Sequence, residues 1–179
     1  ITVIYGFVRG MFIYVALESE KGRAVSFSEA FNAVSKRFWR LILADLLAGL
    51  KVFAWSLLFI IPGIIAAFRY SLLPYVIMSA PEGEKGVKAA HDATKALVSK
   101  RLWEVFGLAT VSAIIPFIGG LLSLSGFAAM HNQLKAYNDA KLEKPKIHWL
   151  NYLGLLLLAL FGILIIGIVV LLIAVFSFS

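Results

Sequence analysis

The sequence contains no cysteine, which excludes disulfide bonds, thiolate catalysis and metal sites built on cysteine. Histidine is scarce: His91, His131 and His148 all fall in charged segments, and we expect His91 and Asp92 to form a surface pair. None has a second histidine at helical spacing, so we expect neither a metal site nor a cofactor. Asp45 is the one carboxylate deep within an apolar region, so acid–base catalysis by two carboxylates lacks its second member, and we expect no catalytic residues.

Charged residues of both signs are also rare, at 15% of the 179 residues, whereas 61% are hydrophobic and the mean hydropathy is +0.90. A soluble domain has roughly 25% charged residues, and the polar residues of this chain could not cover so large an apolar core in water. The sequence therefore predicts an all-α integral membrane protein, with residues 1–179 forming a single domain. Its net charge of +7 does not indicate nucleic acid as a partner, because the cations flank apolar segments and suit the anionic cytoplasmic leaflet.

Four apolar regions alternate with three charged segments along the chain. A helix needs about 20 residues to cross the hydrocarbon layer, so region 41–80 is long enough for a hairpin of two helices. Pro62 and Gly63 lie at its centre, where we expect the turn. The first and last apolar regions, 1–17 and 152–177, each predict one transmembrane helix.

Region 104–130 has Pro116, Gly119 and Gly120 as its helix breakers and fits either a second, shorter hairpin or a single kinked or re-entrant segment. Lysine and arginine are concentrated between the apolar regions, and the positive-inside rule places such segments in the cytoplasm. Neighbouring cytoplasmic segments require an even number of crossings between them, which favours the second hairpin. We therefore expect about six spans: one helix, two Pro/Gly-broken hairpins and a final helix. The cytoplasmic segments are 18–40, 81–103 and 131–149, the last of them a basic loop.

A short motif occurs twice, each time directly before an expected hairpin. It consists of two basic residues and, after one apolar residue, a tryptophan, as expected of an anchor at the membrane surface. An amphipathic stretch precedes each copy: residues 27–38 follow a capping box at Ser26 and Glu29, and residues 87–101 carry a weaker apolar stripe. We expect both stretches to be interfacial helices with the apolar face in the membrane. The anchor residues are Lys36, Arg37 and Trp39 in the first copy and Lys100, Arg101 and Trp103 in the second.

Four charged residues fall within the expected spans: Arg9, Asp45, Lys51 and Arg69. An ionised side chain at bilayer depth costs about 2.5–3.5 kcal/mol on insertion scales, so such residues mark functional sites by default. For Asp45 we weigh pairing with a neighbouring cation, and for Arg69 snorkelling to the outer face. Arg9 and Lys51 reach water less easily and indicate a polar cavity, a lipid headgroup site or a carboxylate of a partner subunit. The surplus of cations over acids favours something anionic.

The first expected hairpin also resembles a known family. The residues concerned are Trp55-Ser56-Leu57, Ile61-Pro62-Gly63-Ile64, Tyr70-Ser71 and Pro74-Tyr75. They are similar to the uncharacterised bacterial membrane proteins of domain-of-unknown-function family 975, which are akin to the membrane domain of some glycerophosphoryl diester phosphodiesterases. The likeness covers about residues 5–140, so the final span lies beyond the family core. It implies a multi-pass protein of the prokaryotic cytoplasmic (inner) membrane and lends no catalytic residues.

Two functions fit these features. The favoured one is a non-enzymatic accessory or scaffolding subunit of a membrane complex, whose partners are membrane lipids and other membrane protein subunits. The alternative is a transporter or lipid-handling protein that binds an anionic group through Arg9, Lys51 and Arg69. Broken hairpins that meet near mid-membrane are common in transporter sites, which supports the alternative. Substitution of Lys51 separates the two, since a scaffold would keep its partner and a transporter would lose flux.

Overall fold

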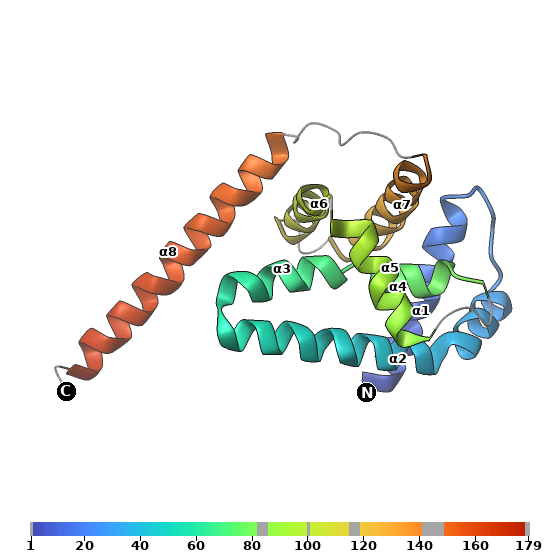
Figure 1. Cartoon of the computed structure of the whole chain (residues 1–179). Coiled ribbons are helices and arrows are strands. Elements are labelled where there is room, and N and C mark those ends of the chain that lie inside the picture. Colours follow the sequence, from blue (N-terminus) through green and yellow to red (C-terminus); the bar gives the residue numbers. More distant parts are fainter. Residues whose placement is uncertain (1, 82–85, 100, 115–118, 141–148, 178–179) are drawn as a thin grey trace.

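The computed structural model describes residues 2–81, 86–99, 101–114, 119–140 and 149–177, and all regular structure in these residues is helical. The all-α prediction is therefore confirmed. Helix α8 extends away from the other helices, which pack around α4 (Figure 1). The helices of the described residues are α1 (Thr2–Ser19), α2 (Phe27–Leu58), α3 (Ile60–Tyr70), α4 (Leu73–Ser79), α5 (Val87–Ser99), α6 (Leu102–Ile114), α7 (Gly119–Asp139) and α8 (Trp149–Ser177).

Helix α2 unites two segments that the sequence analysis keeps apart. Ser26 caps the helix, because its hydroxyl oxygen accepts a hydrogen bond of 3.2 Å from the backbone N–H of Glu29, as the capping box predicts. The helix then continues for 32 residues to Leu58, about 48 Å at 1.5 Å per residue. No proline or glycine occurs between Phe27 and Ala48 to break it. The first amphipathic stretch is therefore not a separate interfacial helix but the beginning of the first hairpin arm.

The first hairpin forms, but its turn lies at Phe59 rather than at Pro62 and Gly63. Phe59 is extended (φ −156°, ψ 139°), and α3 starts at the next residue. Pro62 falls in the first turn of α3, where backbone N–H groups lack intrahelical partners and a proline ring is tolerated. A Cβ at Gly63 would lie 2.8 Å from the Cα of Ser56, so the glycine permits the close approach of α3 to α2.

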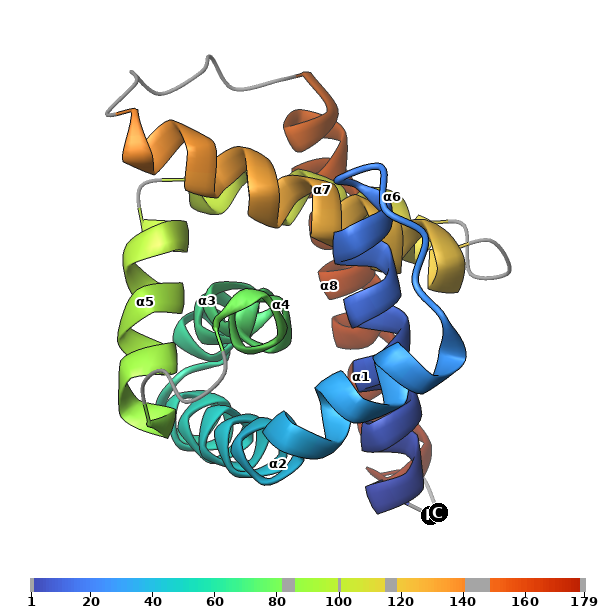
Figure 2. The same ribbon diagram turned by 90° about the vertical axis from the view of Figure 1, so that its right-hand side faces the viewer.

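The second arm of this hairpin bends at Ser71 and Leu72, and its last part, α4, forms the centre of the core. Figure 2 shows α3 and α4 end-on, with α1, α2, α5 and α7 around them. Tyr75 and Met78 pack in an apolar cluster with residues of α1 and α7. Leu73 and Ile77, on another side of α4, pack in a second cluster with α2. Helix α4 thus holds the surrounding helices together.

The second amphipathic stretch forms α5, and its apolar stripe faces the protein. Ala90, Thr94 and Leu97 are buried against the bundle, and Arg101 just beyond the helix is only 3% exposed. The expectation that this stripe lies in the membrane interface is wrong, because α2 and α4 supply the apolar surface that it covers. The apolar residues of α5 do share one face of the helix, and that face packs against the rest of the protein.

Region 104–130 begins in α6 and ends in α7, and both helices run across the first hairpin rather than alongside it (Figure 1). Helix α6 has 13 residues, about 20 Å, which is less than the ~30 Å of a hydrocarbon layer. Pro116 lies outside the described residues, and Gly119 and Gly120 are the first residues of α7. Since α7 ends at Asp139, the first part of segment 131–149 is helical and not a loop.

Two helical segments of the described chain are long and apolar enough to cross a membrane, Phe27–Leu58 and Ile61–Ser79. The arrangement of six spans is therefore not confirmed, since α6 is short and α4 is enclosed by other helices. Helix α8, where we expect the final span at 152–177, has 29 residues. It contacts the bundle through α6, and Leu155 of α8 and Phe106 of α6 line the same pocket.

Candidate functional site

Two of the four charges within the expected spans neutralise each other. Arg9 on α1 and Asp45 on α2 form a salt bridge of 3.1 Å between Nη1 and Oδ2, with 36% and 34% of the side chains exposed. Helix α1 comes close to α2 because it presents Gly10, where a Cβ would lie 3.1 Å from side-chain atoms of Val34 and Leu41. The pairing with a neighbouring cation that we weighed for Asp45 is present, and Arg9 is that cation.

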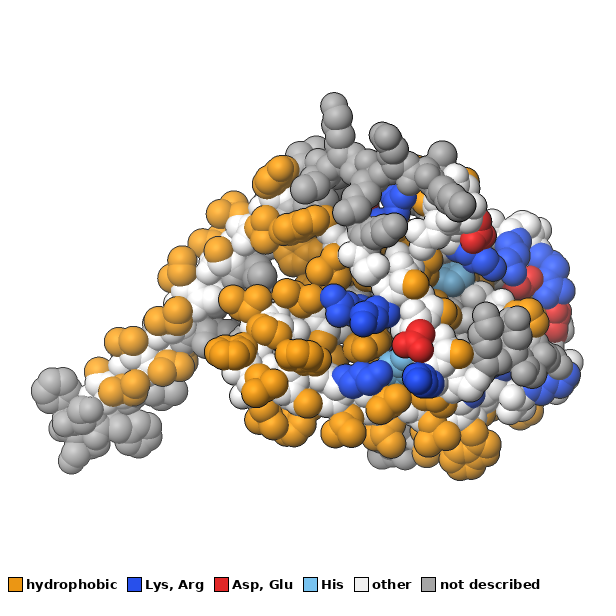
Figure 3. All heavy atoms as spheres, in the orientation of Figure 1, with side chains coloured by type: hydrophobic (Ala, Val, Ile, Leu, Met, Phe, Trp, Pro, Cys, Tyr) orange, Lys and Arg blue, Asp and Glu red, His pale blue; other side chains and the backbone are white. Residues whose placement is uncertain are grey.

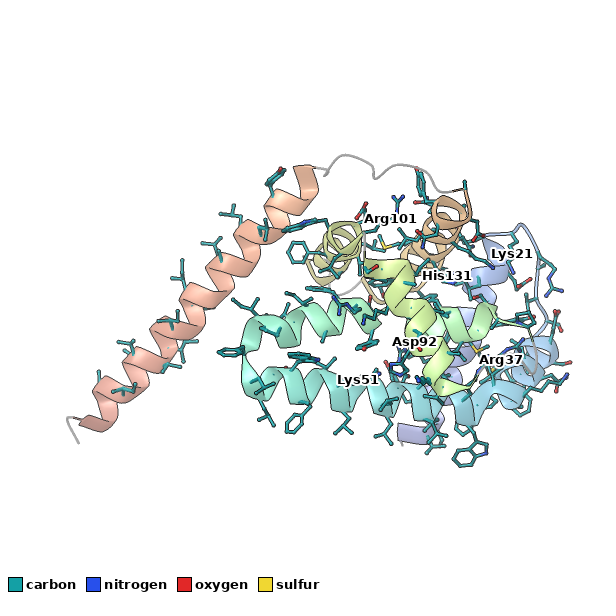
Figure 4. All side chains as sticks on the ribbon, in the orientation of Figure 1. Lys21, Arg37, Lys51, Asp92, Arg101 and His131 are labelled. Carbon is teal, nitrogen blue, oxygen red and sulfur yellow. The ribbon has the colours of Figure 1, made fainter. Side chains whose placement is uncertain are left out.

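Lys51 is held by residues of two other helices. Its Nζ lies 3.1 Å from Nδ1 of His91 on α5 and 5.3 Å from the ring centre of Tyr70 at the end of α3. The Tyr70 and His91 rings are themselves 5.0 Å apart. Figure 4 shows Lys51 on α2 pointing towards α5. Three helices thus surround the ammonium group with an acceptor and a ring face.

His91 is neutral in this arrangement. It is 2% exposed, and its Nε2 lies 3.0 Å from the carbonyl oxygen of Ala44. An ammonium group can only donate, so Nδ1 accepts from Lys51 while Nε2–H donates to Ala44. Burial lowers the pKa of His91, and the positive charge of Lys51 acts in the same direction. The expectation that His91 and Asp92 form a surface pair is wrong for His91, whereas Asp92 is exposed.

Arg69 lies one residue before the end of α3, in its last turn. Its Nε is buried and has no hydrogen-bond partner among the described residues. No contact in the described part of the chain joins Arg9 to Lys51 or Arg69. Arg9 pairs with Asp45 and Lys51 with His91, and the anionic group that we expected Arg9, Lys51 and Arg69 to share stays a prediction.

The residues expected as membrane anchors divide into two groups. Trp39 and Trp103 are 72% and 43% exposed, and Lys36 is exposed, as an anchor requires. Arg37 instead donates a hydrogen bond of 3.0 Å to the carbonyl of Ala80, just after α4, and Arg101 is buried under the ring of Tyr137 at 4.4 Å. These two arginines tie helices together rather than face lipid headgroups. Lys100 lies outside the described residues.

A cavity of about 240 Å³ opens at the basic end of the molecule. It lies between α2, α4, α5 and α7, and Arg40, Ser79, His131 and Lys135 form its polar lining. No pattern in the sequence marks these four residues as a site. Arg40 is fixed at the rim because its Nη2 donates to the carbonyl of Ile77 at 2.9 Å.

Ser79 and His131, 52 positions apart in sequence, meet in this cavity. The Ser79 Oγ lies 3.2 Å from Nε2 of His131, and the other ring nitrogen lies 3.2 Å from Oδ1 of Asn132. Because Nδ1–H donates to the amide oxygen, the neutral ring offers Nε2 as an acceptor to the hydroxyl. His131 is 3% exposed, and burial lowers its pKa.

The burial of both histidines could be predicted from their spacing in the sequence. His91 lies three positions before Thr94, and His131 lies midway between Ala128 and Leu134, so each histidine shares a face with residues that are buried. Helical spacing could therefore have placed both histidines inside. It could not have supplied their partners, which come from other helices.

A large apolar surface remains uncovered on α2. Figure 3 shows hydrophobic side chains over the α2–α3 hairpin and α8, whereas lysine and arginine gather near α5 and at the opposite end of the molecule. Along α2 the exposed apolar residues recur every three or four positions, on the face opposite the buried Leu41, Ala44 and Ala48. They are between 51% and 72% exposed: Trp39, Leu43, Leu46, Leu50, Phe53 and Leu57. We call these six residues the α2 stripe.

Comparisons of the chain with known protein families, with curated proteins and with solved structures return no match. The resemblance to domain-of-unknown-function family 975 accordingly stays a prediction, and the function rests on the α2 stripe, the buried polar pairs and the basic cavity.

Proposed function

We propose that the protein is a membrane-embedded, non-enzymatic module that serves as an accessory or scaffolding subunit of a membrane complex. The α2 stripe carries this proposal, because it runs along a helix long enough to cross a membrane and no residue in the described part of the chain covers it. A core helix of a water-soluble protein would bury such a stripe. Lipid tails or the apolar helix of another subunit are the partners that fit it.

Removing this stripe from water would stabilise the protein by a large free energy. Covering one exposed leucine or phenylalanine side chain stabilises by about 1.5–3 kcal/mol. Half or more of each of the six side chains is exposed, so covering the stripe contributes on the order of 5–10 kcal/mol, similar to the whole stability of a typical domain. The folded chain therefore needs a non-aqueous partner along α2.

The buried charges support a scaffold rather than a transporter. Arg9 is neutralised by Asp45, and Lys51 donates to His91 inside the molecule. Internal pairing of this kind explains how cations persist at bilayer depth without a ligand. We place the module in the prokaryotic cytoplasmic membrane with its basic segments inside, as the distribution of lysine and arginine and the family resemblance suggest.

Binding of an anionic group is the second candidate function. One observation favours it: Arg69 keeps a buried Nε without a hydrogen-bond partner among the described residues. Lys51 and Arg69 would supply the positive charge, whereas Arg9 would not take part. Loss of transport or of a bound lipid on substitution of Lys51 by leucine, with the partner subunits retained, would favour this function over a scaffold.

The test is a glutamate in the α2 stripe. In cells that express the Leu46→Glu variant, we expect the protein to lose its partner subunits, measured by mass spectrometry of gently extracted complexes. Asn32→Glu is the matched control, since Asn32 is exposed on the same helix outside the stripe. Release of the unmodified protein by alkaline carbonate would contradict membrane embedding. A monomer that carries lipids alone would contradict the scaffold.

A further inference from the structure

The six residues of the α2 stripe are spaced as a heptad. Each is separated from the next by four or three positions in strict alternation: Trp39, Leu43, Leu46, Leu50, Phe53 and Leu57. Between Trp39 and Phe53, where the structure describes every residue, the only other exposed residue is Gly49. This spacing places the stripe at positions a and d of a heptad, the seam through which two helices pack as a left-handed coiled coil.

The narrow seam fits a second helix better than lipid tails alone. Lipid tails cover an apolar helix whatever its spacing, as on α8, where the consecutive residues 168–171 are all exposed. On α2 the large residues instead keep to one line, which follows the lower edge of the hairpin in Figures 1 and 3. Exposed small residues flank this line and let another helix backbone approach closely: Gly49, Ala54 and Ser56.

The seam carries no charge that would repel an identical seam. The three charged residues of α2 beyond Trp39 all have partners within the molecule: Arg40 bonds to the Ile77 carbonyl, Asp45 to Arg9 and Lys51 to His91. Like charges in contact across an interface disfavour a partner, and two facing copies of this seam bring none together. The stripe is therefore complementary to itself.

Membrane embedding, on which this inference rests, fixes the direction of such a pair. Two copies inserted with the same topology have parallel α2 helices, so a two-fold contact brings each seam residue to its own counterpart. One heptad earlier the same positions hold the exposed polar residues Asn32 and Lys36, so the apolar seam begins at Trp39. From there to Leu57 it extends about 27 Å at 1.5 Å per residue, close to the ~30 Å of a hydrocarbon layer.

We propose that the α2 stripe is a homodimer interface, in which the α2 helices of two copies pack in parallel as a left-handed pair. The proposal names the first partner of the scaffold as a second copy of this chain. It leaves the α2 surface occupied by protein along the whole hydrocarbon layer, while α8 keeps its contact with lipid.

The absence of cysteine allows the interface to be mapped by cross-linking in native membranes. Four single-cysteine variants are oxidised with copper phenanthroline and analysed by non-reducing electrophoresis: Leu43→Cys, Leu46→Cys, Leu50→Cys and Phe53→Cys. Across a parallel pair, a and d residues lie close enough to their counterparts for a disulfide, which needs Cα atoms within about 7 Å. Trp55→Cys is the matched control, because Trp55 is 51% exposed at similar depth but points away from the seam. We expect a disulfide-linked dimer in the four seam variants and none in the control.

The outcomes distinguish this inference from the proposed function. A dimer in no seam variant, or equal yields in the seam variants and Trp55→Cys, overturns the homodimer. If other subunits are still extracted with the protein in that case, the scaffold function stands without the homodimer. Cross-linking through the seam in a protein that retains no other subunit keeps the homodimer and overturns the scaffold role.

Truncation of one seam residue tests the packing itself. Leu50→Ala should raise the dissociation constant of the dimer in liposomes roughly tenfold, because a central side chain of the interface loses most of its contacts. Trp55→Ala should leave the constant unchanged. Both side chains are more than half exposed, so neither change disturbs the core. Energy transfer between labelled copies is the measurement, and an unchanged constant for Leu50→Ala overturns the seam packing.

Discussion

At the scale of single residues, the charges of this protein are accommodated by partners on facing helices. Asp45 meets Arg9 across the α1–α2 contact, and Lys51 meets His91 across the α2–α5 contact. Asp45 and Lys51 both lie on α2, whose outer side carries the exposed α2 stripe. A charged residue in an apolar segment therefore marks a helix contact here.

The Arg9–Asp45 pair is testable by a double-mutant cycle. Arg9→Gln, Asp45→Asn and the double variant are compared by thermal unfolding in detergent. Because both side chains are about one-third exposed, we expect a coupling free energy of roughly 1 kcal/mol or less. Glu18 and Lys21, a pair at the end of α1 whose lysine side chain is 53% exposed, form the comparison. Strictly additive effects of the first two substitutions would show that the pair contributes nothing.

Buried histidines predict that the protein loses stability in mild acid. The pKa values of His91 and His131 are lowered by burial, so between the folded-state pKa and 6.5 the unfolded chain binds protons that the folded chain does not. Stability is therefore complete above pH 6.5 and falls as the pH drops below it. The midpoint of thermal unfolding, recorded from pH 7.5 to 5.5, should decrease.

A variant with both histidines replaced by glutamine is the control for this pH dependence. Glutamine keeps hydrogen-bonding capacity but does not titrate, so the decrease between pH 7.5 and 5.5 should shrink. The carboxyl of Glu18 acts elsewhere on the pH scale: bonding to Lys21 lowers its pKa below 4.5, so its contribution is lost only in stronger acid. An equal decrease in the double variant would assign the pH dependence to other groups.

At the scale of elements, the tight contact between α2 and α3 depends on one glycine. Gly63 faces Ser56 so closely that a methyl group would meet its backbone, at 2.8 Å from Cα. The proline beside it starts α3, while the turn itself is made by Phe59. Glycine and proline therefore serve different purposes here, although they are neighbours in sequence.

Gly63→Ala should destabilise the protein by about 1–3 kcal/mol, because the backbone of Ser56 cannot move away without separating the two helices. Gly49→Ala is the matched control on α2, where nothing lies within 4 Å of the added Cβ. At that position alanine should stabilise the helix by about 0.5–1 kcal/mol through its higher helix propensity. Unfolding midpoints of both variants are the measurement, and equal effects would contradict the close-contact interpretation.

At the scale of the whole molecule, α6 and α7 cross the long α2–α3 hairpin, and α8 extends away from the other helices. Figures 1 and 2 show that α6 and α7 do not run alongside α2 and α3. On the viewed face, cations gather near α5 and at the end of the molecule away from the hairpin turn, and apolar side chains cover the hairpin (Figure 3). This polarity suits a membrane whose cytoplasmic side lies at the basic end.

The absence of cysteine makes this orientation easy to test. Single cysteines are placed at Ser28, at Ser99 and at Leu58 beside the hairpin turn, all of which are exposed. A membrane-impermeant maleimide added to intact cells should label Leu58→Cys, whereas Ser28→Cys and Ser99→Cys should react only after the membrane is opened. The reverse pattern would contradict the proposed topology, and labelling of all three in intact cells would contradict membrane burial of the hairpin.

The sequence by itself determined the helical class, the N-terminal cap of α2, the presence of a hairpin in 41–80 and the face that α5 buries. These features depend on interactions between residues a few positions apart, so composition and periodicity contain them. The apolar excess likewise indicated a surface for lipid. Region 104–130, in contrast, could not be resolved, because its short arms fit more than one path of the chain.

Only the tertiary structure decided which residues are partners. Periodicity identifies an apolar face but not what covers it, so α5 was assigned to the membrane although α2 and α4 cover it. Lys51 and His91, or Ser79 and His131, are 40 and 52 positions apart, and no local pattern relates them. The basic cavity exists for the same reason: four helices from distant parts of the chain enclose it, and their packing, not their individual sequences, brings Arg40 and Lys135 together.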